Sequence, residues 1–140
     1  MEIRIASTDD EIRACYPTVF QLRAHLAEAE FVAQVRRQQR EGYQLVYLTD
    51  EGRVCAVAGF RLQEMLSPGR HMYVDDLVTD ERERSRGYGD ALFDWLVAWA
   101  RERGCRRLEL DSGVQRAGAH RFYFRKRMHI AHYHFSLTLE

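Results

Sequence analysis

The sequence predicts an α/β fold of the α+β kind, with a mixed, mostly antiparallel central sheet of about six or seven strands and about four flanking helices. Two observations support this prediction. The pattern of the first half predicts a strand, two helices and three strands that two turns can join. The second half begins with a long segment in which apolar residues recur with helical spacing. A length of 140 residues suits one domain spanning 1–140.

The chain is expected to begin with a short strand at Glu2–Ile5, where apolar and charged residues alternate. A helix should follow, because Thr8 and Glu11 have the spacing of a capping box. Pro17 lies inside this helical pattern, and we expect it to break or kink the helix. A second helix is expected from about His25 to Arg40.

Three strands are then expected, which two turns could join as an antiparallel meander. Tyr43–Leu48 and Val54–Leu62 flank an Asp50–Gly52 turn, and a second turn at Ser67–Gly69 leads to a strand at Met72–Thr79. These turn residues are the ones that reverse a chain within a few positions.

The period of the apolar residues changes to three and four over Tyr88–Arg103, which predicts an amphipathic helix. Trp95 and Trp99 lie partly off its apolar stripe, so they indicate either core packing or a homodimer contact. A short strand at Arg107–Leu110, a helix at Ala117–Lys126 and a final strand at Ile130–Leu139 complete the expected fold.

Composition narrows the class of protein. Lys plus Arg and Asp plus Glu both total 21, so no excess charge points to nucleic acid. No apolar run reaches the roughly 20 residues that span a bilayer, and no secretory signal is seen, so we expect a cytoplasmic protein. Cys15, Cys55 and Cys105 form no CxxC pair and are expected to be reduced thiols.

The segment Arg84–Gly89 carries the strongest chemical signal. It lies between a predicted strand and a predicted helix, where glycines let the backbone approach a ligand and the helix start offers free N–H groups. Arg84 and Arg86 add positive charge, so the segment suits a pyrophosphate. The alternative is a plain connecting loop. The sequence lacks both a P-loop motif and the third glycine of a dinucleotide-binding fingerprint.

Two motifs together resemble a known family. Arg84-x-x-Gly87-x-Gly89 with Ala91-Leu92, and the later Ala119–Tyr123, are similar to the two signatures of the GNAT superfamily of N-acyltransferases. The resemblance implies a GNAT-type fold and an N-acetyltransferase that uses acetyl-CoA as co-substrate. It also implies a primary amine of a small molecule or protein as acceptor, attacking directly in a ternary complex.

The resemblance implies catalytic roles for three residues. Asp75 and Asp76 lie on the strand where the family often carries an acidic group near the amine, and a carboxylate can take the amine proton. Strand alternation should point them to opposite faces, unless a bulge intervenes. The alternative to a substrate site is that one or both are surface charges or salt-bridge partners. Tyr123 matches the tyrosine near the CoA sulfur, where a phenol can protonate the thiolate. Core packing is the alternative for Tyr123.

The resemblance also implies a set of acyl-CoA contacts. Backbone N–H groups near Leu77 and Val78 would stabilise the acyl oxygen. The full set is Leu77, Val78, Thr79, Arg84, Ser85, Arg86, Gly87, Tyr88, Gly89, Asp90, Ser112, Arg116 and Phe122.

The chain departs from the family pattern at three places. Ser85 replaces a common glycine. Arg116 replaces an asparagine that contacts the pantetheine arm, so that contact is either absent or made by Ser112. Lys126-Arg127-Met128 replaces the usual Leu-Gly-Phe ending.

Other functions stay open at this point. A non-catalytic acyl-CoA sensor would bind CoA without turnover, and a nucleic-acid-binding domain would use the basic residues around Arg116–Arg127. His129, His132 and His134 lack further ligands, so no metal is expected. The acidic pair hints at a cationic acceptor such as a polyamine, an aminoglycoside or an amino-acid amine. We expect no nucleic-acid or membrane partner.

Overall fold

A strand, two helices and three further strands precede the long helix, as predicted. The computed structural model describes residues 1–140. Its elements are β1 (Glu2–Ile5), α1 (Asp9–Leu22), α2 (Glu28–Gln39), β2 (Tyr43–Asp50), β3 (Arg53–Glu64), β4 (Arg70–Thr79), the 3-10 turn η1 (Glu81–Glu83), α3 (Tyr88–Glu102), β5 (Arg107–Leu110) and α4 (Ala117–Arg125).

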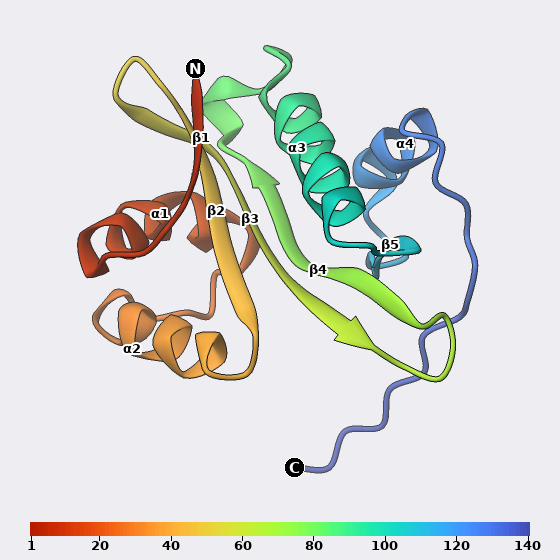
Figure 1. The fold of residues 1–140 in the computed structure, drawn as a ribbon. Helices are drawn as coiled ribbons and strands as arrows, with labels where there is room; N and C mark the ends of the chain where they lie inside the picture. Colours follow the sequence, from red (N-terminus) through yellow and green to blue (C-terminus); the bar gives the residue numbers. More distant parts are fainter. The chain divides into compact units, whose positions relative to one another are not determined.

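The chain divides into two compact units, Met1–Glu109 and Leu110–Glu140. In the first unit the strands follow chain order from β1 to β5, and the pairings from β1 to β4 are antiparallel. Helices α1 and α2 cover one face of this sheet and α3 covers the other (Figure 1). The predicted mixed and mostly antiparallel fold is confirmed.

The sheet has five strands, not the expected six or seven. The predicted strand Ile130–Leu139 does not form, and no residue after Met128 takes part in a backbone hydrogen bond. Alternating apolar residues indicate which face of a strand is apolar, but a strand forms only where its backbone can hydrogen-bond to a neighbouring strand. The large apolar side chains of this segment are exposed: Ile130, Tyr133, Phe135, Leu137 and Leu139.

The sheet is buried on both faces. Leu45, Tyr47 and Val57 pack with Ile12 of α1 and Phe31 of α2 in one buried cluster. A strand covered on both sides carries an almost continuous apolar run, which explains why β2 and β3 do not alternate cleanly.

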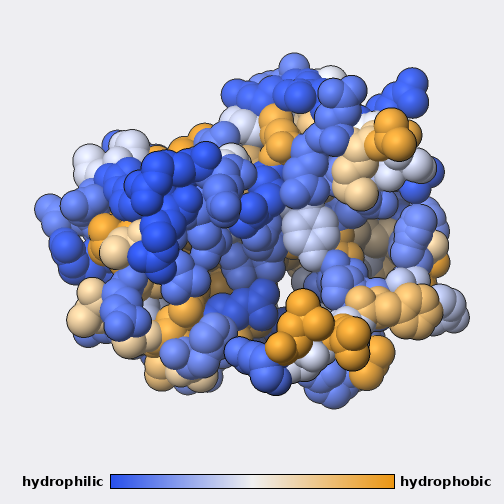
Figure 2. Space-filling model, turned by 90° about the horizontal axis from the view of Figure 1, so that it is seen from below, coloured by the Kyte–Doolittle hydropathy of each residue, from blue (hydrophilic) through white to orange (hydrophobic).

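The two tryptophans of α3 pack against the sheet through Phe60 of β3. The ring centroid of Phe60 on β3 lies 6.2 Å from that of Trp95 and 5.0 Å from that of Trp99. Of the two alternatives for this pair, the structure therefore supports core packing. The face in Figure 2 is largely hydrophilic, with separate groups of hydrophobic residues at the surface.

Helix α1 does not break at Pro17, which lies inside a continuous helix. The capping box of Thr8 and Glu11 is present at its start. Proline removes one hydrogen bond from a helix, yet Ile12 and Val19 on either side are buried against the sheet. Tertiary packing of the apolar face therefore outweighs the local cost of the proline. None of the helices has the length and apolarity needed to cross a lipid bilayer.

Candidate active site

Strand β4 is longer than β5, its neighbour at the edge of the sheet. The N–H of Arg106 donates to the carbonyl of Arg70 at 2.8 Å, so β5 starts beside the start of β4. Because β5 has four residues and β4 has ten, β5 cannot reach the far end of β4. Leu77, Val78 and Thr79 therefore lack a strand neighbour on that side. Backbone groups on an open edge are free to bond a ligand.

The segment Arg84–Gly89 connects this open end of β4 to α3 through η1. Ser85 and Gly87 both adopt left-handed backbone conformations, with φ of 68° and 84°. Gly87 is the N-cap of α3, and the helix start has no side-chain cap. A Cβ at Gly87 would meet no atom within 4 Å, so the space beside the backbone is open. The first N–H groups of α3, starting with those of Tyr88, Gly89 and Asp90, thus meet the requirement for an anion site.

The two arginines of this loop have different surroundings. Arg86 Nη1 lies 3.2 Å from Glu83 Oε2, and Glu83 is buried. Arg53 also pairs with Glu83, through Nη2 and Oε1 at 3.2 Å. Arg84 is exposed. Glu83 therefore anchors Arg86 at the edge of the loop, and Arg84 is the more available cation.

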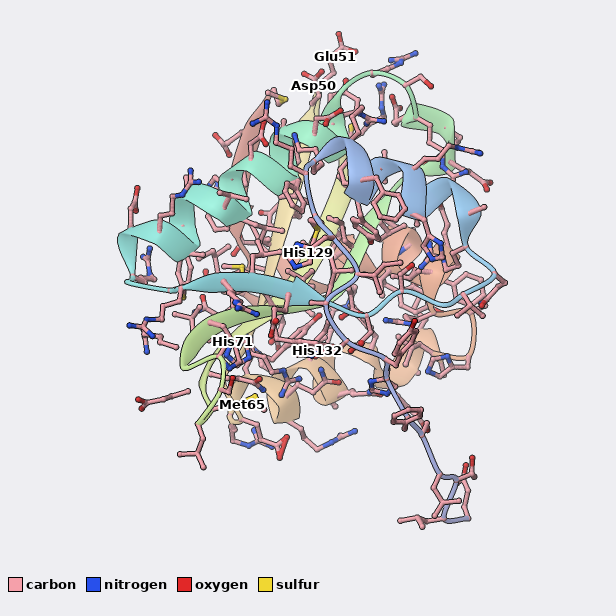
Figure 3. The ribbon with its side chains drawn as sticks, turned by 90° about the vertical axis from the view of Figure 1, so that its right-hand side faces the viewer. Asp50, Glu51, Met65, His71, His129 and His132 are labelled. Carbon is pink, nitrogen blue, oxygen red and sulfur yellow. The ribbon has the colours of Figure 1, made fainter.

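Tyr88 fixes the first turn of α3 to the β2–β3 hairpin. Its hydroxyl donates to Asp50 Oδ2 at 2.6 Å, and Figure 3 shows Asp50 and Glu51 at the end of that hairpin. The hydrogen bond to Asp50 raises the pKa of the Tyr88 phenol. The side chain of Tyr88 is thus used inside the protein, which leaves its backbone as the group that a ligand can contact.

Asp75 and Asp76 lie at a bulge in β4. Gly59 pairs with Asp76 and the next residue, Phe60, pairs with Val74, so Asp75 is the extra residue. A bulge interrupts the alternation of side chains. Asp75 bonds Arg61, whose guanidinium lies 5.4 Å from the ring centroid of Tyr43, and Asp76 bonds Tyr43 itself. Both carboxylates therefore lie on the Tyr43 side of the sheet, because a bulge, which the sequence left open, replaces the expected alternation.

Each carboxylate has its own arginine. Both oxygens of Asp75 accept from Arg61, at 2.8–3.1 Å. Asp76 accepts from Arg23 Nε at 2.9 Å and from the Tyr43 hydroxyl at 2.8 Å. Arg23 Nη2 also donates to the carbonyl of Asp75 at 2.9 Å. The salt bridges that the sequence offered as an alternative are thus present, in a half-buried setting.

Burial governs the acid–base properties of this group. It raises the pKa of Asp75, while the hydrogen bonds and charge of Arg61 act in the opposite direction. Burial, followed by the charge of Asp76, raises the pKa of Tyr43 well above its usual range. Tyr43 is therefore a hydrogen-bond donor to Asp76 and not an acid at neutral pH.

Tyr123, Phe122, Ser112 and Arg116 belong to the second unit. Tyr123 lies on α4 with its ring 5.7 Å from that of Phe122. Burial raises the pKa of the Tyr123 phenol, and the charge of Arg116 lowers it. A phenol with a raised pKa keeps its proton at neutral pH, as a proton donor must.

Two features of the second unit bear on the places where the sequence departs from the family pattern. Ser112 Oγ is buried and has no hydrogen-bond partner, so it can accept one from a ligand. Arg127 has a φ of 69°, so an arginine occupies a left-handed turn that the family builds with glycine. The turn forms despite the substitution of Lys126-Arg127-Met128.

Sequence comparison identifies the family. The profile of the Acetyltransferase (GNAT) family matches residues 5–129. Over 118 residues the chain is 34% identical to YhdJ of Bacillus subtilis (strain 168), described as an uncharacterized N-acetyltransferase, covering 84% of this chain and 83% of that protein. The chain belongs to the GNAT acetyltransferase family. This GNAT protein is an acyl-CoA-dependent acetyltransferase with acetyl-CoA as its donor, as the two motifs predicted.

Solved structures confirm the GNAT fold. Ribosomal-protein-alanine N-acetyltransferase from Brucella melitensis biovar Abortus 2308 superposes with a TM-score of 0.84 at 16% identity, covering 99% of this chain and 100% of that one. Aminoglycoside N-acetyltransferase AAC(6')-Iy in complex with CoA has a TM-score of 0.85 at 12% identity, covering 99% and 93%. At these identities the likeness concerns the fold alone.

The motifs did not reveal Arg23, Arg61 and Tyr43. These residues come from α1, β3 and β2, and only the folded sheet brings them to Asp75 and Asp76. One signal was present in the sequence: Gly59 stands alone inside an apolar strand, which is typical of a bulge or a close approach of another group.

Proposed function

We propose that this GNAT protein transfers the acetyl group of acetyl-CoA directly to a primary amine of a small molecule or a protein, with both substrates bound together. The open end of β4, continuing into Arg84–Gly89 and the uncapped start of α3, is the observation that carries the proposal. These features lie within one unit of the structure and supply adjacent backbone donors for an acyl group and a pyrophosphate.

The residues of Leu77–Asp90 divide into two roles under this proposal. The N–H groups near Leu77 and Val78 bond the acyl oxygen, which gains negative charge as the amine attacks. The N–H groups of Gly87, Tyr88 and Gly89, together with Arg84, hold the pyrophosphate. Ser112 and Arg116 extend the contacts along the pantetheine arm, supported by the unpartnered hydroxyl of Ser112.

Proton transfer completes the reaction. The amine forms a C–N bond to the acyl carbon, the C–S bond breaks, and the sulfur needs a proton. Tyr123 donates that proton. Asp75 and Asp76 take the proton that the amine loses, directly or through water. Burial raises the pKa of Asp75, which favours proton uptake by that carboxylate.

The proposal treats 1–140 as one catalytic domain, because the family profile spans both units. We place it in the cytoplasm, since its three cysteines are all free thiols.

We also propose a homodimer in which a second copy covers the apolar side chains of 130–139, of which Tyr133, Phe135 and Leu139 are 84–91% exposed. The molar mass in solution tests that contact. The acceptor is the only other partner proposed.

Release of free thiol from acetyl-CoA, followed across a panel of amines, tests the proposed function. Tyr123→Phe is expected to lower kcat by about 100-fold, a typical loss for general acid catalysis, with CoA affinity unchanged. Tyr133→Phe is the matched control for loss of a tyrosine hydroxyl, because Tyr133 lies outside the residues proposed to contact acetyl-CoA and the amine. CoA binding without thiol release from any amine would instead identify a sensor.

A further inference from the structure

The four charges around the β4 bulge balance one another. Arg61 pairs with Asp75 through Nη2 and Oδ2 at 2.8 Å, and Arg23 pairs with Asp76 at 2.9 Å. The next acidic group that acts on Arg61 is Glu41, which is exposed and screened by water. A cationic acceptor therefore meets no net negative charge here, although the sequence shows two adjacent aspartates.

The two arginines are not equally fixed. Arg61 lies within β3 with its side chain 20% exposed, and it holds Asp75 with two nitrogens. Arg23 is the C-cap of α1, one residue past the helix, and its side chain is 41% exposed. Only Nε and Nη2 of Arg23 take part in its hydrogen bonds, so the Nη1 side of the guanidinium faces no protein acceptor.

Asp76 is held in place without Arg23. The hydroxyl of buried Tyr43 donates to Oδ2, whereas Arg23 bonds only Oδ1. An incoming ammonium group can replace the guanidinium at Oδ1 while Tyr43 keeps the carboxylate oriented. The displaced guanidinium then needs an anion, because an unpaired charge in a half-buried site is unfavourable.

We propose that the acceptor is a zwitterionic amine of the amino-acid class, whose ammonium group binds Asp76 and whose carboxylate binds Arg23. Such a molecule brings no net charge to a balanced site and supplies both the cation for Asp76 and the anion for Arg23. A guanidinium and a carboxylate also form a strong paired hydrogen bond. This inference rests on the proposed function and specifies its acceptor, and it makes Arg23 a specificity-determining residue.

Matched acceptors test the proposal. Thiol release is measured with the common L-amino acids, their methyl esters and their decarboxylated amines, which differ in the carboxylate. The best amino acid should exceed its ester and its amine in kcat/KM by about tenfold or more, the range expected when a site loses a charged partner. Arg23→Gln should abolish that preference, with the amine unaffected or improved.

Arg13→Gln is the matched control, because Arg13 is an exposed arginine of the same helix that pairs with Asp10. It should leave the preference intact. Equal loss for amino acid and amine in Arg23→Gln, or a polyamine or aminoglycoside that exceeds every amino acid, would overturn the inference.

Failure of the inference is distinguishable from failure of the proposed function. Acetylation of amines without a carboxylate, and of no amino acid, leaves the function standing and refutes the inference. If no amine is acetylated, calorimetry with CoA-saturated protein still decides: binding of an amino acid that Arg23→Gln abolishes supports the inference, and absence of binding refutes it.

Discussion

Gly59→Ala is expected to displace the Tyr43 ring that orients Asp76, and so to disturb the acidic site and destabilise the protein. A Cβ at Gly59 would lie closer than 3.0 Å to the hydroxyl oxygen and to two ring carbons of Tyr43. Tyr43 is buried and bonded to Asp76, so its ring cannot swing away without losing that bond. The glycine is therefore a requirement of packing, and its backbone conformation is an ordinary one.

The cost has two parts. A lost hydrogen bond to a charged group costs about 1.5–3 kcal/mol, and an overfilled core costs about 1–3 kcal/mol more. Gly59→Ala should thus lower the free energy of unfolding by about 2.5–6 kcal/mol, a large part of the 5–15 kcal/mol typical of a domain. Urea unfolding measures this loss.

A double-mutant cycle isolates the cause. Tyr43→Val removes the ring, so adding Gly59→Ala to it should cost less than about 1 kcal/mol. Tyr43→Phe keeps the ring carbons, so Gly59→Ala should remain costly there. Gly118→Ala is the control, since its Cβ would meet no atom within 4 Å on a helix and should stabilise by about 0.5–1 kcal/mol. A Gly59→Ala protein within about 1 kcal/mol of the parent would refute the reasoning.

Two further predictions concern the loop and the start of α1. Ser85→Gly should stabilise the protein by about 0.5–1 kcal/mol in urea unfolding, because Ser85 has a φ of 68° and a left-handed serine costs more than the flexibility of glycine; a destabilised variant would contradict it. Hydrogen bonds from Tyr47, Ser7 and Thr8 lower the pKa of Glu11 from 4.5 to about 2. The stability this gives is complete above pH 4.5 and is lost as the pH falls toward 2. Unfolding measured across that range should show a shallower acid loss in Glu11→Gln, and an unchanged slope would count against the assignment.

The charge balance at the bulge changes how the acidic pair is interpreted. Two adjacent aspartates on a strand suggest a cationic acceptor, yet Arg23 and Arg61 neutralise them. The proposed acceptor class therefore depends on residues outside the family motifs. A relative that kept the acidic pair but lacked an arginine equivalent to Arg23 would be expected to prefer cationic amines.

The sequence by itself determined the features that depend on neighbouring residues. The capping box at Thr8 and Glu11, the hairpin turn at Glu51 and Gly52, and the helix after Arg84–Gly89 all form as predicted. Each depends on contacts within a few positions of the chain, which a local pattern records. The two family motifs are local in the same sense, and the family profile confirmed the family that they predicted.

The tertiary structure alone decided the rest. Helix α1 continues through Pro17 because its apolar face is buried, and the alternating segment Ile130–Leu139 forms no strand because it has no bonded neighbour. The bulge that turns Asp75 and Asp76 to one side arises where β4 meets β3. Their partners Arg23, Arg61 and Tyr43 come from three other elements. Pairing between distant segments depends on the register and packing of the whole sheet, which no local pattern specifies.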